Sequence, residues 1–535
     1  MDREINVDSI RVLEEQIEEH EMAIVKLKRA RNSLLNVSTL PPEVLGNIFR
    51  WNVTLKDAFG GLEEESHNFL LVCHHWFEVA SRTPELWTFW GTSLGEWEER
   101  HLRSRVGAPL DLVLDGLIYC YGSVSESQRR VLEDRATRDT IRRVHLHSQT
   151  HSDLTSIISP LISPCGGLQT NALESLILIN EHEDPLDVSF LTRSRLSKLR
   201  HLKLTGCTIS SWDHLMSQTA LLTTLELFFD DVPPRPTMPQ LLSILTSNPH
   251  LQNLTLNTHA IPDDVGDGLS QQVPLRHLEK LRLDGDVGRV FGLLRRLEYP
   301  KEMGELSLNP SCTVADISQT IGPYVRDYLR RRGRSRDGLG LSLSSLGSLI
   351  VFHVGNVGAL HSTSQRDRMV SFMEFTIGLD PVPGDVQEKM TLDLLAYTPR
   401  EEVVYFQACG SLTVVEDLRV QLPNLKVLDL LMVPLYAAFS TPISEDGSHV
   451  QERFPPSLQH IYLGRLIVNG YDWIPLVAFL ARRASVGNQL DSLIIDGPCH
   501  MCSTTAEGIR RIVRTQFWVN KGCLESWCPF GSCWY

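Results

Sequence analysis

The residues best suited to bind a metal ion lie near the C-terminal end of the chain. Cys499, His500 and Cys502 stand close together, and further cysteines, Cys523, Cys528 and Cys533, begin some twenty residues later. Two close pairs of thiolate or imidazole ligands are the outline of a zinc site. The second pair, however, is spaced more widely than the first. We therefore predict no metal site and no cofactor.

Motifs for phosphate transfer or metal-dependent hydrolysis are missing from the sequence. It contains no Gly-x-x-x-x-Gly-Lys-Ser/Thr loop and no His-Glu-x-x-His pattern. Histidine and carboxylate residues are scattered along the chain, as surface residues usually are. We predict that the protein is not an enzyme.

The one basic cluster in the sequence runs from Arg326 to Arg336, in a chain with a formal net charge of -14. Such a short arginine run is compatible with a nuclear-import signal, with a docking site for an acidic or phosphorylated partner, or with a solvated loop. The overall acidity argues against broad electrostatic capture of nucleic acid. We expect no nucleic-acid partner.

Two apolar segments near the N-terminus predict a pair of packed helices. In the first, Pro41 and Pro42 suit a helix start, because a missing N–H costs little there. The apolar residues that follow recur at helical spacing and form one face: Val44, Leu45, Ile48 and Phe49. In the second segment, Cys73, Trp76 and Ala80 fall on one helical stripe. Such stripes are also common in ordinary helical cores.

The residues that follow the second helix support the prediction that the two segments form a packed pair. Pro84 breaks the chain after the helix, and Leu86-Trp87 then supplies a large apolar anchor of the kind that dominates protein interfaces. The connection between the two segments, residues 50–68, is long and contains Gly60-Gly61 and an acidic run. A surface insertion costs little, because closure entropy grows only logarithmically with loop length.

Together the two segments resemble an F-box. The family opens with Leu-Pro-x-Glu-Ile/Leu-Leu-x-x-Ile-Phe, and Leu40 to Phe49 matches this pattern; Val72 to Trp87 resembles its closing half, whereas the connection is longer than usual. The resemblance implies binding to the Skp-family linker of a cullin-RING ubiquitin ligase. The residues implied in that contact are Leu40, Pro41, Val44, Leu45, Ile48, Val72, Cys73, Trp76 and Trp87.

A heptad pattern precedes these segments and predicts one helix over residues 4–36. Its core positions alternate spacings of three and four, and two of them are the polar residues His20 and Arg31: Ile10, Leu13, Ile17, His20, Ile24, Leu27, Arg31 and Leu34. The helix is acidic early and basic late, which suits its dipole. It is expected either to self-associate as a short coiled coil or to fold back on the domain that follows it.

Beyond residue 140 the sequence repeats. Leu-x-x-Leu-x-Leu or a close variant ends at residues 178, 204, 227, 256, 283 and 308, a period typical of leucine-rich repeats. Weaker copies end at residues 146, 351, 430, 463 and 495, and Phe372-Phe375-Ile377 fits the spacing in a less regular region. The fold class predicted is α/β: an N-terminal helix and a small helical domain followed by a curved solenoid of parallel strands with helices or loops on its convex side.

Strand alternation places one residue of each copy on the opposite, concave face. These outward residues are mixed in charge, which suits a protein partner and not a hydrocarbon surface. The candidates for binding a substrate protein are Lys203, Glu226, Thr255, Arg282 and Ser307.

Length and composition limit the cellular location and the domain organisation that the sequence allows. The chain has 535 residues, of which 42% are hydrophobic and 22% charged, and it shows neither a membrane-spanning run nor a signal sequence. We expect an intracellular protein, cytoplasmic or nuclear. The predicted organisation is a heptad helix at 1–36, an F-box-like domain at 37–90, a linker at 91–139, repeats at 140–510 and an irregular tail at 511–535.

The whole order resembles F-box proteins with leucine-rich repeats, including those of fungi. The resemblance implies a substrate-recognition adaptor of an SCF-type ubiquitin ligase, which would bring a substrate near the ubiquitin-loaded enzyme without catalysing the transfer. The alternative is a scaffold outside any ligase that dimerises through its N-terminal helix.

Overall fold

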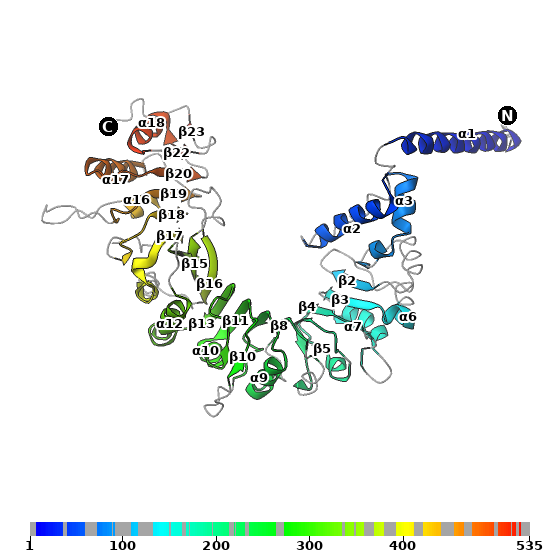
Figure 1. The fold of residues 1–535 in the computed structure, drawn as a ribbon, viewed down its shortest axis with the longest axis horizontal. Helices are drawn as coiled ribbons and strands as arrows, with labels where there is room; N and C mark the ends of the chain where they lie inside the picture. The colour runs from blue at the N-terminus through cyan, green and yellow to red at the C-terminus, as the bar shows by residue number, and fades with distance from the viewer. Residues whose placement is uncertain are drawn as a thin grey trace, which may run out of the picture. The chain divides into compact units, whose positions relative to one another are not determined.

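A computed structural model (Figure 1) places the chain in two compact units, Met1–Leu222 and Thr223–Tyr535. The described residues are 7–35, 40–58, 72–87, 89–90, 109–115, 132–148, 151–162, 167–168, 170, 172–194, 196–212, 219, 221–230, 235–263, 272–333, 338–346, 349–357, 369–378, 392–410, 421–439, 454–464, 473–496, 501–514, 516–519 and 524–525.

The first unit begins with the expected helices. The heptad region forms one continuous helix, α1 (Val7–Ser33). The two apolar segments form α2 (Pro42–Ala58) and α3 (His74–Ser81), followed by one turn of 3-10 helix, η3 (Pro84–Trp87). Helix α3 ends just before Pro84, as expected from the restriction that proline places on the preceding residue.

Parallel strands follow in the same unit. Each pairs with the next in the order β1 (Phe89–Trp90), β2 (Leu110–Asp115), β3 (Ile141–Ser148), β4 (Ser175–Asn180) and β6 (His201–Thr205). Val144, Leu176 and Leu202 stand in register and are buried, as the repeat pattern predicts. The ladder starts earlier than expected: β2 lies inside the segment 91–139 that we predicted to be a linker. Its short strand was missed because no full Leu-x-x-Leu-x-Leu copy marks it.

The second unit opens with four parallel strands: β8 (Thr224–Phe228), β9 (Asn253–Leu256), β11 (Lys280–Asp286) and β13 (Glu305–Ser311). Their repeat leucines align, with Leu254 beside Leu281 and Leu281 beside Leu306, and all three are fully buried. Helix α9 (Met238–Ser247) lies between β8 and β9 in the chain, and α10 (Val287–Leu294) follows β11. Thr237 and Gln240 start α9 with a reciprocal capping box.

The middle of this unit departs from the predicted repeats. Strands β14 (Leu339–Leu346), β15 (Leu349–Val357) and β16 (Met369–Gly378) form an antiparallel meander, so that the spatial order is β13, β16, β15, β14, β17. The copy predicted at 346–351 is therefore wrong, because Leu346 and Leu349 face each other across a hairpin. The copy at 372–377 is shifted: Met373, not Phe375, stands beside Leu306.

The parallel arrangement then resumes. Strands β17 (Val403–Gly410), β18 (Val427–Leu431), β19 (His460–Gly464), β20 (Ser492–Asp496) and β22 (Gln516–Val519) pair in that order. The copies predicted to end at 430, 463 and 495 are thereby in register. Strand β22 lies within the predicted irregular tail, so the ladder extends further than expected.

The remaining elements are short or connect these strands. They are α6 (Arg135–Arg138), α7 (His151–Ile158), η4 (Ser159–Leu161), β5 (Leu186–Asp187), η5 (Ser189–Arg193), β7 (Cys207–Thr208), β10 (Val273–Pro274), β12 (Leu297–Glu298), α11 (Val314–Asp316), η6 (Ile317–Ile321), α12 (Gly322–Arg332), η7 (Arg400–Glu402), α16 (Leu435–Phe439), α17 (Trp473–Ser485), β21 (Met501–Cys502), α18 (Ser503–Ile512) and β23 (Leu524–Glu525).

The predicted α/β class is confirmed, with mostly parallel strands and connecting helices. Alternation buries one row of side chains in β4 and β9, where every second residue is buried, whereas consecutive residues are buried in β18, β19 and β20. Within the described segments, no helix combines the length and apolarity needed to cross a membrane.

Candidate functional site

A small apolar core holds α2, α3 and η3 together. Leu45 and Phe49 from α2 are buried against Val79 and Ala80 from α3 and Leu86 from η3. Leu45 is 0% exposed. It was predicted to contact a partner, but it is buried in this core. Any effect of Leu45 on binding would therefore act through the packing of the two helices.

A second stripe on α2 is exposed. Val44, Ile48 and Trp51 recur at spacings of four and three, which places them on one side of the helix. Ile48 is 48% exposed and Trp51 is 76% exposed. Val72, just before α3, is exposed as well. Large apolar groups left in water on a helix supported by its own core are typical of a surface that binds another protein.

The other predicted partner-binding residues divide between these two environments. Pro41 is exposed at the start of α2, whereas Leu40 and Trp76 are partly buried against the core. Cys73 is the N-cap residue of α3 and has an extended backbone. Trp87 belongs to η3, and its side chain lies outside the described residues.

The strand face of the second unit brings four of the predicted substrate-binding residues into one row. Glu226, Thr255, Arg282 and Ser307 are consecutive neighbours across β8, β9, β11 and β13. Arg282 is exposed, Glu226 and Thr255 are partly exposed, and Ser307 is buried. Ser307 is thus poorly placed to contact a partner. Lys203 lies in the first unit, beside Ile177, and is partly exposed.

Charged side chains of both signs surround this row. Lys280 Nζ lies 3.1 Å from Glu305 Oε2 across β11 and β13, and both side chains are more than half exposed. Arg282 Nε lies 3.4 Å from Asp284 Oδ2. The exposed ion pairs contribute little to stability, since solvent screens them. They provide instead a patterned polar surface that can select a partner by charge.

On β17 and β18 the same strand face is buried and not exposed. The sequence did not predict this difference. Asp429 on β18 is fully buried, and its Oδ2 accepts hydrogen bonds from Tyr405 Oη at 2.7 Å and Gln407 Nε2 at 3.2 Å. Gln407 Oε1 accepts from Ser342 Oγ at 2.6 Å. A buried carboxylate needs such donors, because an unpaired charge would be costly. A partner of the second unit is therefore better accommodated on β8, β9, β11 and β13 than on β17 and β18.

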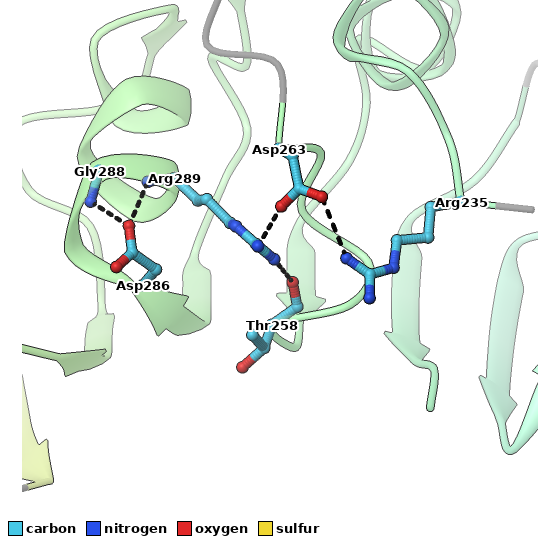
Figure 2. Close-up of polar contacts among 6 residues, drawn as sticks. All are labelled: Arg235, Thr258, Asp263, Asp286, Gly288 and Arg289. Carbon is cyan, nitrogen blue, oxygen red and sulfur yellow. Dashed lines mark hydrogen bonds and ion pairs between the residues drawn. The ribbon is translucent and has the colours of Figure 1, made fainter. Parts of the chain in front are cut away.

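A group of ion pairs connects the segments that follow β8, β9 and β11 (Figure 2). Asp263, after β9, pairs with Arg235 Nη1 at 3.3 Å and also with Arg289 at the start of α10. Arg289 Nη1 additionally donates to the Thr258 carbonyl at 3.2 Å. Asp286 caps α10 by accepting from the backbone N–H of Gly288 at 2.8 Å. One carboxylate thus links three successive segments.

The basic cluster is helical over Arg326 to Arg332, so the solvated-loop alternative is wrong for this part. These residues belong to α12, and Arg326, Arg330 and Arg332 line a cavity of about 800 Å³. Glu302 and Glu402 line the same cavity and offset part of its positive charge. The cluster beyond Gly333 lies outside the described residues.

Two of these arginines already contact protein groups. Arg326 lies over the ring of Tyr397, with 5.6 Å to the ring centroid, and Arg332 Nη1 donates to the Met303 carbonyl at 3.2 Å. The positive side chains in the last turn of α12 also suit the negative end of the helix dipole. The cavity therefore has a structural explanation and is a weaker binding candidate than α2.

The residues considered as metal ligands lie outside the part of the chain that the structure describes. They are Cys499, His500, Cys523, Cys528 and Cys533, together with the side chain of Cys502. Among the residues that are described, no group of three His, Cys, Asp or Glu side chains could hold a metal ion.

The sequence also contains one Gly-x-Ser-x-Gly match, at residues 91–95. This spacing occurs at the nucleophile elbow of hydrolases, where a strand, a sharp turn and a helix expose the serine. The match follows β1 directly and lies outside the described residues. No catalytic role is assigned to it.

No family model matches the chain, and no curated protein matches it in sequence. The functional interpretation therefore depends on the motifs and on the geometry of the chain itself.

Proposed function

We propose that the protein is a substrate-recognition adaptor of an SCF-type ubiquitin ligase. In this proposal α2, α3 and η3 form an F-box that binds a Skp-family linker, and through it the cullin ligase core. The parallel strands form a leucine-rich-repeat solenoid that binds a substrate protein. The adaptor itself would not be catalytic and would act in the cytoplasm or nucleus.

The observation that carries the proposal is the exposed stripe of Val44, Ile48 and Trp51 on α2, beside a compact apolar core. Its sequence context is the Leu-Pro opening and the Trp-containing second helix of the F-box pattern. Binding energy in protein interfaces concentrates on a few large apolar or aromatic residues. We expect Ile48 and Trp51 to contribute more to linker binding than Pro41 or Val72.

The substrate-binding part is supported by the row Glu226, Thr255 and Arg282 and by the adjacent Lys280–Glu305 pair. A surface with alternating charge discriminates between partners by electrostatic complementarity. The adaptor would then work by proximity, raising the effective concentration of a bound substrate near the ubiquitin-loaded enzyme.

The proposal is tested by measuring binding of the purified full chain to a recombinant Skp-family linker. Ile48→Asp places a charge in the exposed stripe without touching Leu45 or Phe49, and we expect it to weaken binding at least tenfold, as hot-spot substitutions do. Ile474→Asp is the matched control, because Ile474 is an exposed apolar residue on α17 in the other unit.

Two results would count against the adaptor function. One is the absence of linker binding by the wild-type chain. The other is equal weakening by Ile48→Asp and Ile474→Asp, which would indicate a nonspecific effect. Unchanged circular dichroism of both variants would show that folding is preserved. Substitution of Leu45 is unsuitable for this purpose, since it would disrupt the core.

The alternative, a scaffold outside any ligase, is favoured by the exposed apolar stripe of α1. It predicts self-association without linker binding. The linker experiment therefore separates the two functions, because only the adaptor depends on α2.

A further inference from the structure

The apolar stripe of α1 is exposed along its described length. The apolar core positions within α1 are between 44% and 72% exposed, namely Ile10, Leu13, Ile17, Ile24 and Leu27, and Leu34 in the turn that follows is 83% exposed. The expectation that this helix folds back on the following domain is not met by the described residues. A helix of 27 residues is about 40 Å long, so its stripe offers a continuous seam for a partner.

The composition of the stripe fits a second helix of the same kind. Isoleucine occupies the first core position of three heptads, and leucine occupies the second core position of three, which gives the apolar seam of a coiled coil. The two polar residues at core positions, His20 and Arg31, then determine whether the two helices run parallel or antiparallel. In a parallel pair of identical helices, each residue at a core position faces its own counterpart.

A parallel pair would place like groups together. Arg31 would face Arg31 in the core, and His20 would face His20. The acidic half of the helix, rich in glutamate from Glu14 to Glu21, would lie along the same acidic half of the other copy. The basic half, from Lys26 to Arg31, would do the same. Like charges at such short separations are destabilising.

An antiparallel pair avoids most of these contacts, and the like-charge contact that it keeps is between the two copies of Glu21 near its centre. When Ile10 faces Leu34 of the second copy, the heptad geometry brings Arg31 against Leu13 and His20 against Ile24, so that neither polar residue meets itself. The acidic half of each helix then lies along the basic half of the other. At the flanking positions Glu14 faces Lys28 of the second copy, and this pair occurs twice in the dimer.

We infer that the protein forms a homodimer through α1, with the two helices antiparallel. The inference is independent of linker binding, because α1 and the stripe on α2 are separate surfaces. The partner that binds the apolar stripe of α1 is a second copy of this chain, because the acidic half of one helix complements the basic half of the other.

The orientation is tested by charge exchange at positions 14 and 28 in the full chain, with the dimer dissociation constant measured by analytical ultracentrifugation. Glu14→Lys alone creates two Lys–Lys contacts in the antiparallel dimer, and Lys28→Glu alone creates two Glu–Glu contacts. Each is expected to raise the dissociation constant about three- to tenfold. The double variant restores both opposite-charge pairs and is expected to return close to wild type.

A parallel dimer predicts a different result. There position 14 lies beside Ser9 and position 28 beside Ala23 of the second copy, so each single substitution is expected to change the dissociation constant little. Single variants that dimerise as tightly as wild type would overturn the antiparallel arrangement. Positions 14 and 28 are about 21 Å apart on one helix, so they do not interact within a monomer.

Dimer formation itself is tested with Ile17→Asp, which puts a charge in the seam and is expected to make the chain monomeric. Glu18→Gln changes a neighbouring residue outside the seam and is the matched control. A monomeric wild-type chain across the measured concentration range would overturn the inference, as would a dimer that persists in Ile17→Asp. Linker binding by Ile17→Asp is expected to be unchanged, which separates this inference from the proposed adaptor function.

Discussion

The rings of Phe49 and Trp76 pack together with 5.1 Å between their centroids and an interplanar angle of 56°. This contact joins α2 to α3, because each ring comes from a different helix. Phe49 is nearly fully buried and Trp76 partly so. Tilted aromatic pairs at this distance contribute beyond their buried area. The pair therefore fixes the angle at which α2 presents Ile48 and Trp51 to solvent.

Phe49→Ala is expected to destabilise the α2–α3 segment by about 3 kcal/mol, because a large buried ring leaves a cavity. Hydrogen exchange of the α2 and α3 amides would measure this locally, as an opening free energy that falls in the variant. Val44→Ala is the control, since Val44 is exposed, and it should change protection very little. Equal protection in wild type and Phe49→Ala would show that the ring does not support the helices.

The repeat leucines made the strand register predictable from the sequence. Leu254, Leu281 and Leu306 recur with nearly constant spacing, and a strand with a period of two can bury such a row only when it is in register with its neighbours. Neighbours in the outward row, such as Thr255 and Arg282, followed directly from that register. The helices α2 and α3 were predictable for the related reason that their apolar residues recur at helical spacing.

The antiparallel meander and the buried polar network were not predictable in this way. Leu346, Leu349 and Val351 have the spacing of a repeat strand, but the pattern does not encode a hairpin between Leu346 and Leu349. Asp429 occupies an outward position and would ordinarily be read as solvated. Only the packing of Tyr405 and Gln407 around it shows that this part of the face is closed. Non-local packing overrides the local pattern at both places.

The buried guanidinium of Arg483 predicts that even a conservative substitution will be costly. It is 1% exposed, and its donors reach the carbonyls of Pro455, Leu458 and Asn488 at 3.0 to 3.1 Å. Lysine carries its three donors on one nitrogen and cannot span these acceptors.

Arg483→Lys should therefore lower the free energy of unfolding by about 2 to 3 kcal/mol, since buried carbonyls lose their partners. Denaturant unfolding of the full chain would measure the loss. The neighbouring exposed Arg482→Lys should stay within about 0.5 kcal/mol of wild type. If both substitutions had the same small effect, the carbonyl contacts of Arg483 would not contribute to stability.

Removing the ion pairs of Asp263 is expected to cause a smaller loss of unfolding free energy. Asp263 is 62% exposed, whereas Arg235 and Arg289 are mostly buried, so solvent screens part of each ion pair. Asp263→Asn is expected to cost about 1 kcal/mol, because it leaves two partly buried cations without a carboxylate between them. Asp230→Asn is the matched control: Asp230 is exposed and makes no ion pair among the described residues. The loss with Asp263→Asn should shrink at high salt in denaturant unfolding, and a salt-independent loss would contradict an electrostatic origin.

His353 on β15 makes the stability of the second unit depend on pH. It faces Glu374 on β16, with 3.6 Å between Nε2 and Oε2. Burial lowers the pKa of His353 below its ordinary value of 6.5, and the Glu374 carboxylate opposes this only in part. The unfolded chain therefore binds a proton at this histidine at higher pH than the folded chain does.

Stability is expected to fall as pH drops below about 6.5, because protonation then favours the unfolded chain, and to be fully present above that value. His353→Gln removes this contribution, so its unfolding free energy should decline less steeply than that of wild type between about pH 7 and pH 5. Denaturant unfolding at several pH values measures both slopes. A slope in His353→Gln as steep as wild type would show that Glu374 compensates fully for the burial of the imidazole.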